Sequence, residues 1–442
     1  MQFPRFTSSD RDLNITYAYR AEVFLKHIKT TPNGYVVTEF LPDVPWAGIY
    51  NTISCAAMHH FREGRWLTDP AVLEDYARFW CTEGNPRLYS FPLADSVQSY
   101  ADVTGNDRLA EELYPQMAEI CRAWDDHRTE SGMYRQDDDR DGMEYAISGA
   151  GIRPTINCYM AADMLALAKT ARRIGRTDEA ESFEKEAKSL IRAIQNELWN
   201  EEIGMYGVIS DSGEKQNVRE PVGYIPWIYG FAQNGRDGAF RYLLDESCFL
   251  SPHGIRTADA SHPLYMDTPT PHECLWNGPV WPFASAQTLT AVIEYLHTAE
   301  QPVISAADFT KLLLTYAASQ RDTDGTPFID ENMHPDTGIW LAREILRSRN
   351  RSDRERGHHY NHSTFIDLVM TGICGIRPSS EDTLLIHPLG TSLDAFSACD
   401  IHYHGHTLDI YWNKKEGLRV YKDGTECTRC PAGDTVEAEI EV

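Results

Sequence analysis

Acidic side chains crowd one short segment of the sequence, residues 135–149, which reads RQDDDRDGMEYAISG. Within eight residues it holds Asp137, Asp138, Asp139, Asp141 and Glu144. Carboxylates held this close repel one another, so their proximity needs a physical reason. Three explanations are open: a solvated loop between helices, a calcium-binding loop, or a catalytic carboxylate with neighbours that assist it.

The calcium explanation fails at one ligand. Asp137, Asp139, Asp141 and Gly142 match the first, third, fifth and sixth positions of an EF-hand loop. The twelfth position of such a loop needs a glutamate that binds with both oxygens, and Ser148 stands there. We therefore expect no metal at this segment.

The residues after the acidic run bear on the other two explanations. A polar connection between helices explains Asp-Asp-Asp-Arg by itself. The run continues, however, into Met143, Tyr145 and Ile147 and then the small residues 148–151. Such a sequence favours carboxylates that enter a cleft, where desolvation raises a carboxyl pKa as a general acid requires.

A second carboxylate that could do chemistry lies in PFIDENMHPDTGIW, which contains Asp330 and Glu331. A further candidate loop is WNGPVWPF, where Trp276 and Trp281 lie on either side of a turn before a predicted helix. The chain has 10 tryptophans and 22 tyrosines. Aromatic rings in loops suit the stacking of sugar rings, although most tryptophans of a large helical protein fill its core. For Trp227 the core is the preferred interpretation.

Composition limits the class of protein. The chain has 442 residues, 42% hydrophobic and 24% charged, which is typical of a globular protein with a large core. A formal charge of −25 disfavours nucleic-acid binding. No apolar run is long enough to span a membrane. The first residues lack the features of a signal peptide, which predicts a cytoplasmic protein, or a periplasmic one whose signal was trimmed.

Helical periodicity runs from about residue 47 to 375. Helices are predicted within 69–84, 107–132, 155–175, 177–200, 279–298, 305–322 and 361–375. With weaker segments, ten to twelve helices in hairpins are expected, a pattern typical of a helical toroid or solenoid. After residue 376 the sequence alternates with the period of strands.

These patterns predict three regions. Residues 1–45 are expected to form an N-terminal extended or strand segment, with GYVVTEFL as a strand. Residues 46–375 are expected to form a mainly α domain that contains the candidate catalytic carboxylates. Residues 376–442 form a small antiparallel β segment docked on the helices. The Cys427–Cys430 pair in this last segment lacks the second pair that a zinc ribbon needs, so a packing role is expected.

Several motifs resemble those of the six-hairpin glycosidases around glycoside hydrolase family 63 and the trehalases. They are WNGPVWPF, ENMHPDTG, the helix pair after the acidic loop, and HHYNHSTFIDLVMTGICGIRP. The resemblance covers the chain from about Trp46. It implies an (α/α)6 toroid whose central cavity hydrolyses a terminal glycosidic bond with inversion, without cofactor or metal.

The resemblance also implies the catalytic pair. ENMHPDTG is similar to the family's ENYNPETG, in which the glutamate is the general base, so that role falls on Glu331. The family's acid is an aspartate in a GWDNSP-like segment before a helix with Leu-Asn. Here DRDGMEYAISG and TIN take that place, so the acid is predicted to be Asp141, with Asp139 as second choice.

Neighbouring residues are expected to bind substrate or to tune the acid. Asp139 and Glu144 would raise the pKa of Asp141 or hold sugar hydroxyls, and Arg140 and Arg153 would balance charge. The predicted substrate contacts are Trp46, Asp139, Arg140, Glu144, Tyr145, Arg153, Trp276, Asn277, Trp281, His359 and Tyr360.

The substrate and two alternatives stay open. A small α-glucoside or α-mannoside is favoured, with a glycosyl-glycerate, arabinofuranoside or rhamnoside possible; the oligomeric state is open. A non-catalytic carbohydrate-binding toroid is one alternative. The other is a polysaccharide lyase or epimerase that uses Tyr360 and His359. His358 and His362 are spaced as metal ligands, but spacing alone is weak evidence, and hydroxyl binding is the preferred interpretation.

Overall fold

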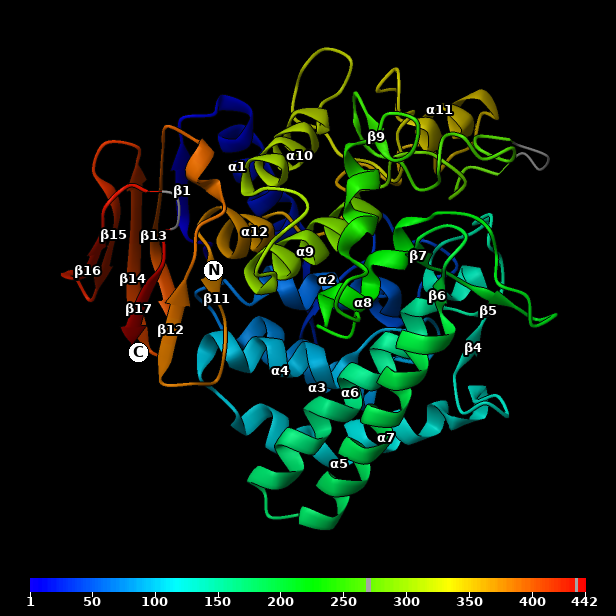
Figure 1. The fold of residues 1–442 in the computed structure, drawn as a ribbon, viewed down its shortest axis with the longest axis horizontal. Helices are drawn as coiled ribbons and strands as arrows, with labels where there is room; N and C mark the ends of the chain where they lie inside the picture. The colour runs from blue at the N-terminus through cyan, green and yellow to red at the C-terminus, as the bar shows by residue number, and fades with distance from the viewer. Residues whose placement is uncertain (268–271, 434–435) are drawn as a thin grey trace.

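The computed structural model describes residues 1–267, 272–433 and 436–442, and Figure 1 shows a mainly helical protein with small sheets. Every helix predicted from the sequence is present. The early helices are α2 (Ser54–Gly64), α3 (Ala71–Thr82), α4 (Leu93–Thr104), α5 (Arg108–Ala123), α6 (Pro154–Arg173) and α7 (Thr177–Glu197). Later come α8 (Ile225–Ile228), α9 (Pro282–Thr298), α10 (Ala306–Ser319), α11 (Leu341–Ser348) and α12 (Ile366–Leu368), which continues as a π-helical turn over Val369–Ile373.

The pair α6 and α7 shows how the sequence produces a hairpin. Pro154 stands in the first turn of α6, where a proline has no hydrogen bond to lose. Gly175, with φ of 77°, reverses the chain before α7 begins at Thr177. Helix α7 buries one stripe, Ala180, Phe183, Ala187, Leu190 and Ile194, against α6.

Some helices are buried on almost every side and contact one another in a closed cycle. Helix α2 contacts α4, α4 contacts α6, α6 contacts α8, α8 contacts α9, α9 contacts α12, and α12 contacts α2. Helix α7, which buries only one face, packs on α6 outside this cycle, and α10 packs on α9. Helices α2, α6 and α9 have most of their residues buried, as expected for helices on the inner side of such a cycle.

Two antiparallel sheets lie beside the helices at the left of Figure 1. The larger has the order β1-β13-β14-β15-β16, with β1 (Arg5–Ser8), β13 (Ala395–Tyr403), β14 (His406–Asn413), β15 (Gly417–Lys422) and β16 (Thr425–Cys430). The smaller joins β11 (Ile376–Arg377), β12 (Thr383–Ile386) and β17 (Ala438–Glu441). The strands predicted after residue 376 are confirmed, and β1 adds a strand from the other end of the chain.

The extended segment predicted for residues 1–45 is wrong for Arg11–His27, which forms the 17-residue helix α1. Asp10 caps the helix, because its side chain accepts a hydrogen bond from Leu13 N at 2.8 Å. The segment is rich in aromatic and β-branched residues, which favour strands, but burial at helical spacing outweighs that preference. The predicted strand GYVVTEFL is confirmed over its first half, as β3 (Gly34–Val37) paired with β2 (Ile28–Thr31), whereas residues 38–41 are not part of a strand.

Short elements fill the stretch between α7 and α9. They include a 3₁₀ helix at Pro221–Tyr224, another at Asp237–Leu244, and the two-residue strands β6 (Trp199–Asn200), β7 (Met205–Tyr206), β8 (Ile209–Ser210), β9 (Leu250–Ser251) and β10 (Gly254–Ile255). Strand β8 joins a small sheet with β4 (Arg135–Gln136) and β5 (Gly151–Ile152), which flank the acidic segment.

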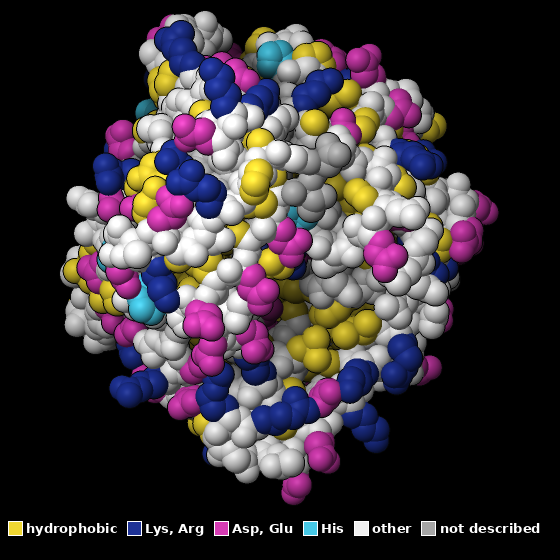
Figure 2. Space-filling view, turned by 60° about the vertical axis from the view of Figure 1, so that its left-hand side comes forward, with side chains coloured by type: hydrophobic (Ala, Val, Ile, Leu, Met, Phe, Trp, Pro, Cys, Tyr) yellow, Lys and Arg dark blue, Asp and Glu magenta, His cyan; other side chains and the backbone are white. Residues whose placement is uncertain are grey.

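The surface carries the acidic excess of the composition. Figure 2 shows Asp and Glu side chains beside a hollow near the middle of one face. In the described residues no helix is both long and apolar enough to cross a membrane.

A buried carboxylate joins α12 to α2. Glu63, 1% exposed, accepts hydrogen bonds of 2.9–3.0 Å from the backbone N–H groups of residues 365–367. These groups begin a helix and have no partner within it, so the carboxylate satisfies them and its charge suits the helix dipole. Asp367 in turn accepts from Arg65 Nε at 2.8 Å and Trp66 Nε1 at 2.7 Å.

Replacing Glu63 with Ala is expected to destabilise the protein by about 3 kcal/mol, because it leaves three buried N–H groups unsatisfied. Chemical denaturation of Glu63→Ala measures this. The exposed Glu130→Ala provides the matched control, with an expected change below about 0.5 kcal/mol. Equal stability of the two variants would show that the α2–α12 contact does not depend on Glu63.

Candidate active site

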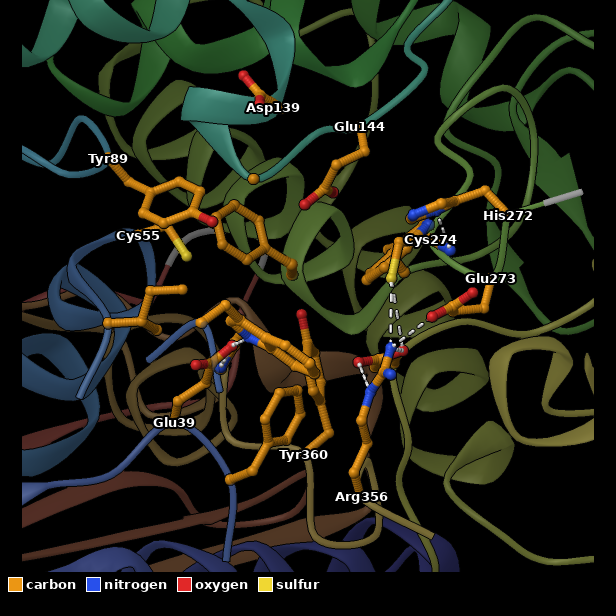
Figure 3. A pocket seen from close by; sticks show the side chains of 18 of the residues that line it. Glu39, Cys55, Tyr89, Asp139, Glu144, His272, Glu273, Cys274, Arg356 and Tyr360 are labelled. Carbon is orange, nitrogen blue, oxygen red and sulfur yellow. Dashed lines mark hydrogen bonds and ion pairs between the residues drawn. The ribbon is translucent and has the colours of Figure 1, made fainter. Parts of the chain in front are cut away.

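A cavity of about 290 Å³ opens where α2 and α9 begin. Loops from distant parts of the sequence line it: the segment before α2, the acidic loop, residues 272–274, the start of α9, Glu331, and the stretch 351–362. Among the described lining residues five carry carboxyl groups: Glu39, Asp139, Glu144, Glu273 and Glu331. Figure 3 shows Glu144 and Arg356 on opposite sides of this space.

Glu331 is held in place by its neighbours in the chain. Met333 forms reciprocal backbone hydrogen bonds with Val280 at 2.8 Å, next to the start of α9. The side chain of Asn332 donates to Glu273 O at 2.8 Å and accepts from Ala342 N at 2.9 Å. These bonds fix the backbone on the C-terminal side of Glu331.

The carboxylate of Glu331 is paired with Arg356. Nε of Arg356 lies 3.3 Å from Oε1, and the nitrogen NH2 lies 3.4 Å from Oε2. The same guanidinium also binds Glu273 Oε1 at 3.2 Å. Burial acts to lower the pKa of Arg356, but the charges of Glu331, Cys274 and Glu273 raise it well above its ordinary value. Arg356 therefore stays charged and forms a charge-assisted pair with the Glu331 carboxyl group.

Glu144 faces Glu331 in a different environment. Burial raises the pKa of Glu144 to about 7, and the charges of Glu331 and Asp139 add to this effect. The loop is shaped by left-handed backbone at Gly142 (φ 73°) and Tyr145 (φ 61°). The backbone carbonyl of Glu144 accepts a hydrogen bond from Trp276 N at 3.1 Å, which joins the acidic loop to the segment before α9.

Asp141 lies outside the cavity, so the structure corrects its predicted role as the acid. Its Oδ2 accepts hydrogen bonds from Arg153 Nε and Thr155 Oγ1, and its Oδ1 accepts one from Ser90 Oγ at 3.1 Å. The side chains of Asp141 and Arg153 are both 0% exposed. The pair fastens the 3₁₀ helix Asp138–Asp141 to the start of α6, and neither residue can reach a ligand in the cavity.

The structure brings about half of the residues predicted as the site into the cavity lining: Trp46, Asp139, Glu144, Trp281, Glu331 and Tyr360. Two others lie one layer behind it. Trp276 stacks on Trp281 with ring centroids 4.4 Å apart, and Asn277 donates to the backbone carbonyl of Leu264 at 3.4 Å. They support the wall and do not line the cavity.

The remaining predicted contacts point elsewhere. The guanidinium of Arg140 lies over the ring of Tyr89, 5.5 Å from its centroid. Tyr145 is 46% exposed and is not part of the lining. The two ring nitrogens of His359 lie 3.2 Å from Tyr19 Oη and 3.2 Å from Lys26 Nζ, so its ring faces α1.

Sequence reasoning missed several lining residues, including Glu39, Glu273, Cys274 and Arg356. It also gave Glu144 only a supporting role. A signal for Glu144 was present: Gly142-Met143-Glu144 aligns with Gly-Trp-Asp of the GWDNSP-like segment when the comparison begins at the glycine. No comparable local pattern marks Glu39 or Arg356.

Asp141→Ala is expected to lose about 3–5 kcal/mol of stability, because it leaves the buried charge of Arg153 without its partner. Denaturation with urea measures the change. The control is Asp137→Ala, whose exposed pair with Arg135 contributes less than about 1 kcal/mol. A stable Asp141→Ala protein that has lost turnover would contradict the structural role.

Comparison with known proteins gives one family and a set of structures. Residues 49–363 match the family model "Mannosylglycerate hydrolase MGH1-like glycoside hydrolase domain". A solved structure titled "Sialidase" is 33% identical with a TM-score of 0.92, covering 99% of this chain and 41% of that one. This chain thus spans about two fifths of that protein. No curated protein sequence matches.

Two more distant structures share the fold. A family GH63 mannosylglycerate hydrolase from Thermus thermophilus, in complex with glucose, is 14% identical with a TM-score of 0.57, covering 80% of this chain and 99% of that one. A family GH78 rhamnosidase of Bacillus sp. GL1 is 14% identical with a TM-score of 0.60, covering 96% of this chain and 42% of that one.

Proposed function

Since the chain belongs to the family of MGH1-like glycoside hydrolase domains, we propose that its cavity hydrolyses a terminal glycosidic bond with inversion. Glu144 is the proton donor and Glu331 the base. The observation that carries this proposal is that two carboxyl groups line one cavity in different environments. Glu331 is paired with Arg356, whereas burial raises the pKa of Glu144 to about 7.

Each group has one task in the reaction. Glu144 gives its proton to the glycosidic oxygen as the bond from that oxygen to the anomeric carbon breaks. Glu331 takes a proton from a water molecule, whose oxygen attacks the anomeric carbon from the opposite face. The sugar leaves with inverted configuration, and the proton on Glu331 returns to solvent and then to Glu144.

The architecture supports an exo-acting enzyme. We interpret the closed cycle of inner helices as an (α/α)6 toroid, with the catalytic domain at 46–375, the N-terminal segment at 1–45 and the β segment at 376–442. The cavity is at the small end of the range for ligand sites, about 300–1,000 Å³, which suits the end of a glycan or a small glycoside. Aromatic rings of Trp281 and Tyr360 offer stacking surfaces for a sugar.

An α-glucoside or α-mannoside is the favoured substrate, since the family model carries the name of a mannosylglycerate hydrolase. A rhamnoside is the second candidate substrate, because the fold is shared with the Bacillus rhamnosidase. The lyase alternative loses its acid, because His359 faces α1 and is not in the cavity lining.

Glu331→Gln is expected to lower kcat roughly a hundredfold to ten-thousandfold on every substrate, because the water always needs a base. Glu144→Gln should lose most on glycosides of simple alcohols and least on p-nitrophenyl glycosides, whose leaving group needs no proton. Steady-state kinetics on both substrate types separates the roles. Equal losses of Glu144→Gln on both would contradict the acid assignment, and retained turnover by Glu331→Gln would contradict the base assignment.

The rate should fall as pH rises through about 7, because the active form of Glu144 is the protonated one and its pKa is raised to about 7. A profile of kcat/KM between about pH 4 and 9 measures this limb. NMR of the first product formed reports the anomer directly. A retained configuration, or a rate that stays constant to about pH 9, would contradict the mechanism.

A further inference from the structure

We propose that Glu39, in the segment 38–46 that precedes the toroid, forms hydrogen bonds with hydroxyl groups of the bound sugar. We further propose that this sugar is uncharged. The inference rests on the proposed function and adds the substrate class to it. Glu39 and Trp46 both line the cavity, yet both precede residue 49, where the family match begins. Both residues therefore lie outside the segment that the family model matches.

The backbone around Glu39 is firmly held. Asn51, whose φ of 64° is left-handed, donates from its side chain to Phe40 O at 2.8 Å and Pro42 O at 3.0 Å. Its Oδ1 accepts from Val44 N at 3.0 Å, and its backbone carbonyl accepts from Glu39 N at 2.9 Å. One asparagine thus shapes the whole turn that presents Glu39.

A buried histidine ties this turn to the neighbouring stretch that holds Tyr360 and His362. His27 Nδ1 lies 3.0 Å from Thr38 Oγ1, and Nε2 lies 2.8 Å from His359 O. Burial lowers the pKa of His27 to about 4, so the ring is neutral and donates from Nε2 to the carbonyl. The N-terminal segment and the stretch with Tyr360 and His362 are therefore one rigid wall.

Glu39 is polar, buried and incompletely bonded. It is 3% exposed, and its Oε1 accepts from Trp46 Nε1 at 3.1 Å. In the described part of the chain its Oε2 has no hydrogen-bond partner. Nor does Nε2 of His362, another buried lining residue, 3.9 Å from Glu39 Oε1. Two unsatisfied polar groups at one end of a cavity point to a ligand with adjacent hydroxyls.

The charge state of Glu39 suits hydroxyls better than ions. Burial raises its pKa to about 8, and the neighbouring charges of Glu331 and Glu144 add to this, while Trp46 and Arg356 oppose it. At neutral pH the carboxyl group is protonated, so it donates one hydrogen bond and accepts another. A pair of sugar hydroxyls offers the complementary acceptor and donor.

The cations of the cavity are already paired. Arg356 binds Glu331 and Glu273. Arg351, which is half exposed, binds both oxygens of Asp353 at 3.0 Å. Among the described lining residues no other arginine or lysine is present. A carboxylate on the bound sugar, as in a uronic or sialic acid, would lie among five carboxyl groups. The two arginines that line the cavity are already paired with other carboxylates. The name of the 33%-identical "Sialidase" structure is therefore not a guide to this cavity.

The first test is a substrate panel on the full chain: p-nitrophenyl glycosides of neutral hexoses, 6-deoxyhexoses and pentoses, with the glucuronide and the sialoside beside them. Turnover of at least one neutral glycoside, at a kcat/KM at least a hundredfold above both acidic ones, is expected. Preference for an acidic glycoside would overturn the inference and leave the proposed hydrolase intact. Hydrolysis of none would overturn both.

The second test uses Glu39. Glu39→Ala should raise KM roughly tenfold or more on the best neutral glycoside, with a smaller effect on kcat. Glu39→Gln should restore much of the binding, because an amide also donates and accepts. The control Asp43→Asn changes an exposed side chain of the same turn. Equal losses in the Ala and Gln variants would show that Glu39 acts as an ion and would overturn the inference, as would an unchanged KM in Glu39→Ala.

Discussion

Repulsion between carboxyl groups is the constraint on which this site depends. Five of them line one small cavity, and they cannot all be ionised together without a large electrostatic cost. The structure reduces this cost in two ways: Arg356 pairs with Glu331 and Glu273 on one side of the cavity, and burial raises the pKa of Glu144 to about 7 and that of Glu39 to about 8. In the mechanism proposed above, the same arrangement would provide an acid and a base in one space.

This arrangement depends in turn on the closed cycle of helices. Buried helices such as α2 and α9 begin at the cavity, and the loops that precede them carry Glu39 and Trp281 to its wall. Glu63 joins α2 to α12 by accepting hydrogen bonds from the free N–H groups at the start of α12. Helix α2 therefore belongs both to the cycle of helices and to the cavity. Asp141 contributes to the same purpose, since its buried pair with Arg153 fixes the base of the acidic loop.

The sequence predicted the helices well because their periodicity is local, and the local motif around Glu331 marked a residue that does line the cavity. The residue proposed as the acid was harder to identify, because Asp139, Asp141 and Glu144 face different directions, which are set by left-handed turns at Gly142 and Tyr145. Glu39 lay beyond prediction, since its role arises from contacts with residues hundreds of positions away. Helix α1 was missed because burial outweighed the strand preference of its residues.

The pairing of β1 with β13 has a consequence for biosynthesis. Arg5 lies opposite Cys399 in the register, so β1 pairs with β13 only after the helical region between them has been synthesised. Contacts so distant in sequence form late in folding. The N-terminal segment with Glu39 likewise contacts His359 and His362, so this wall of the cavity is complete only after that stretch has been synthesised. Chains that end before it would lack part of the cavity.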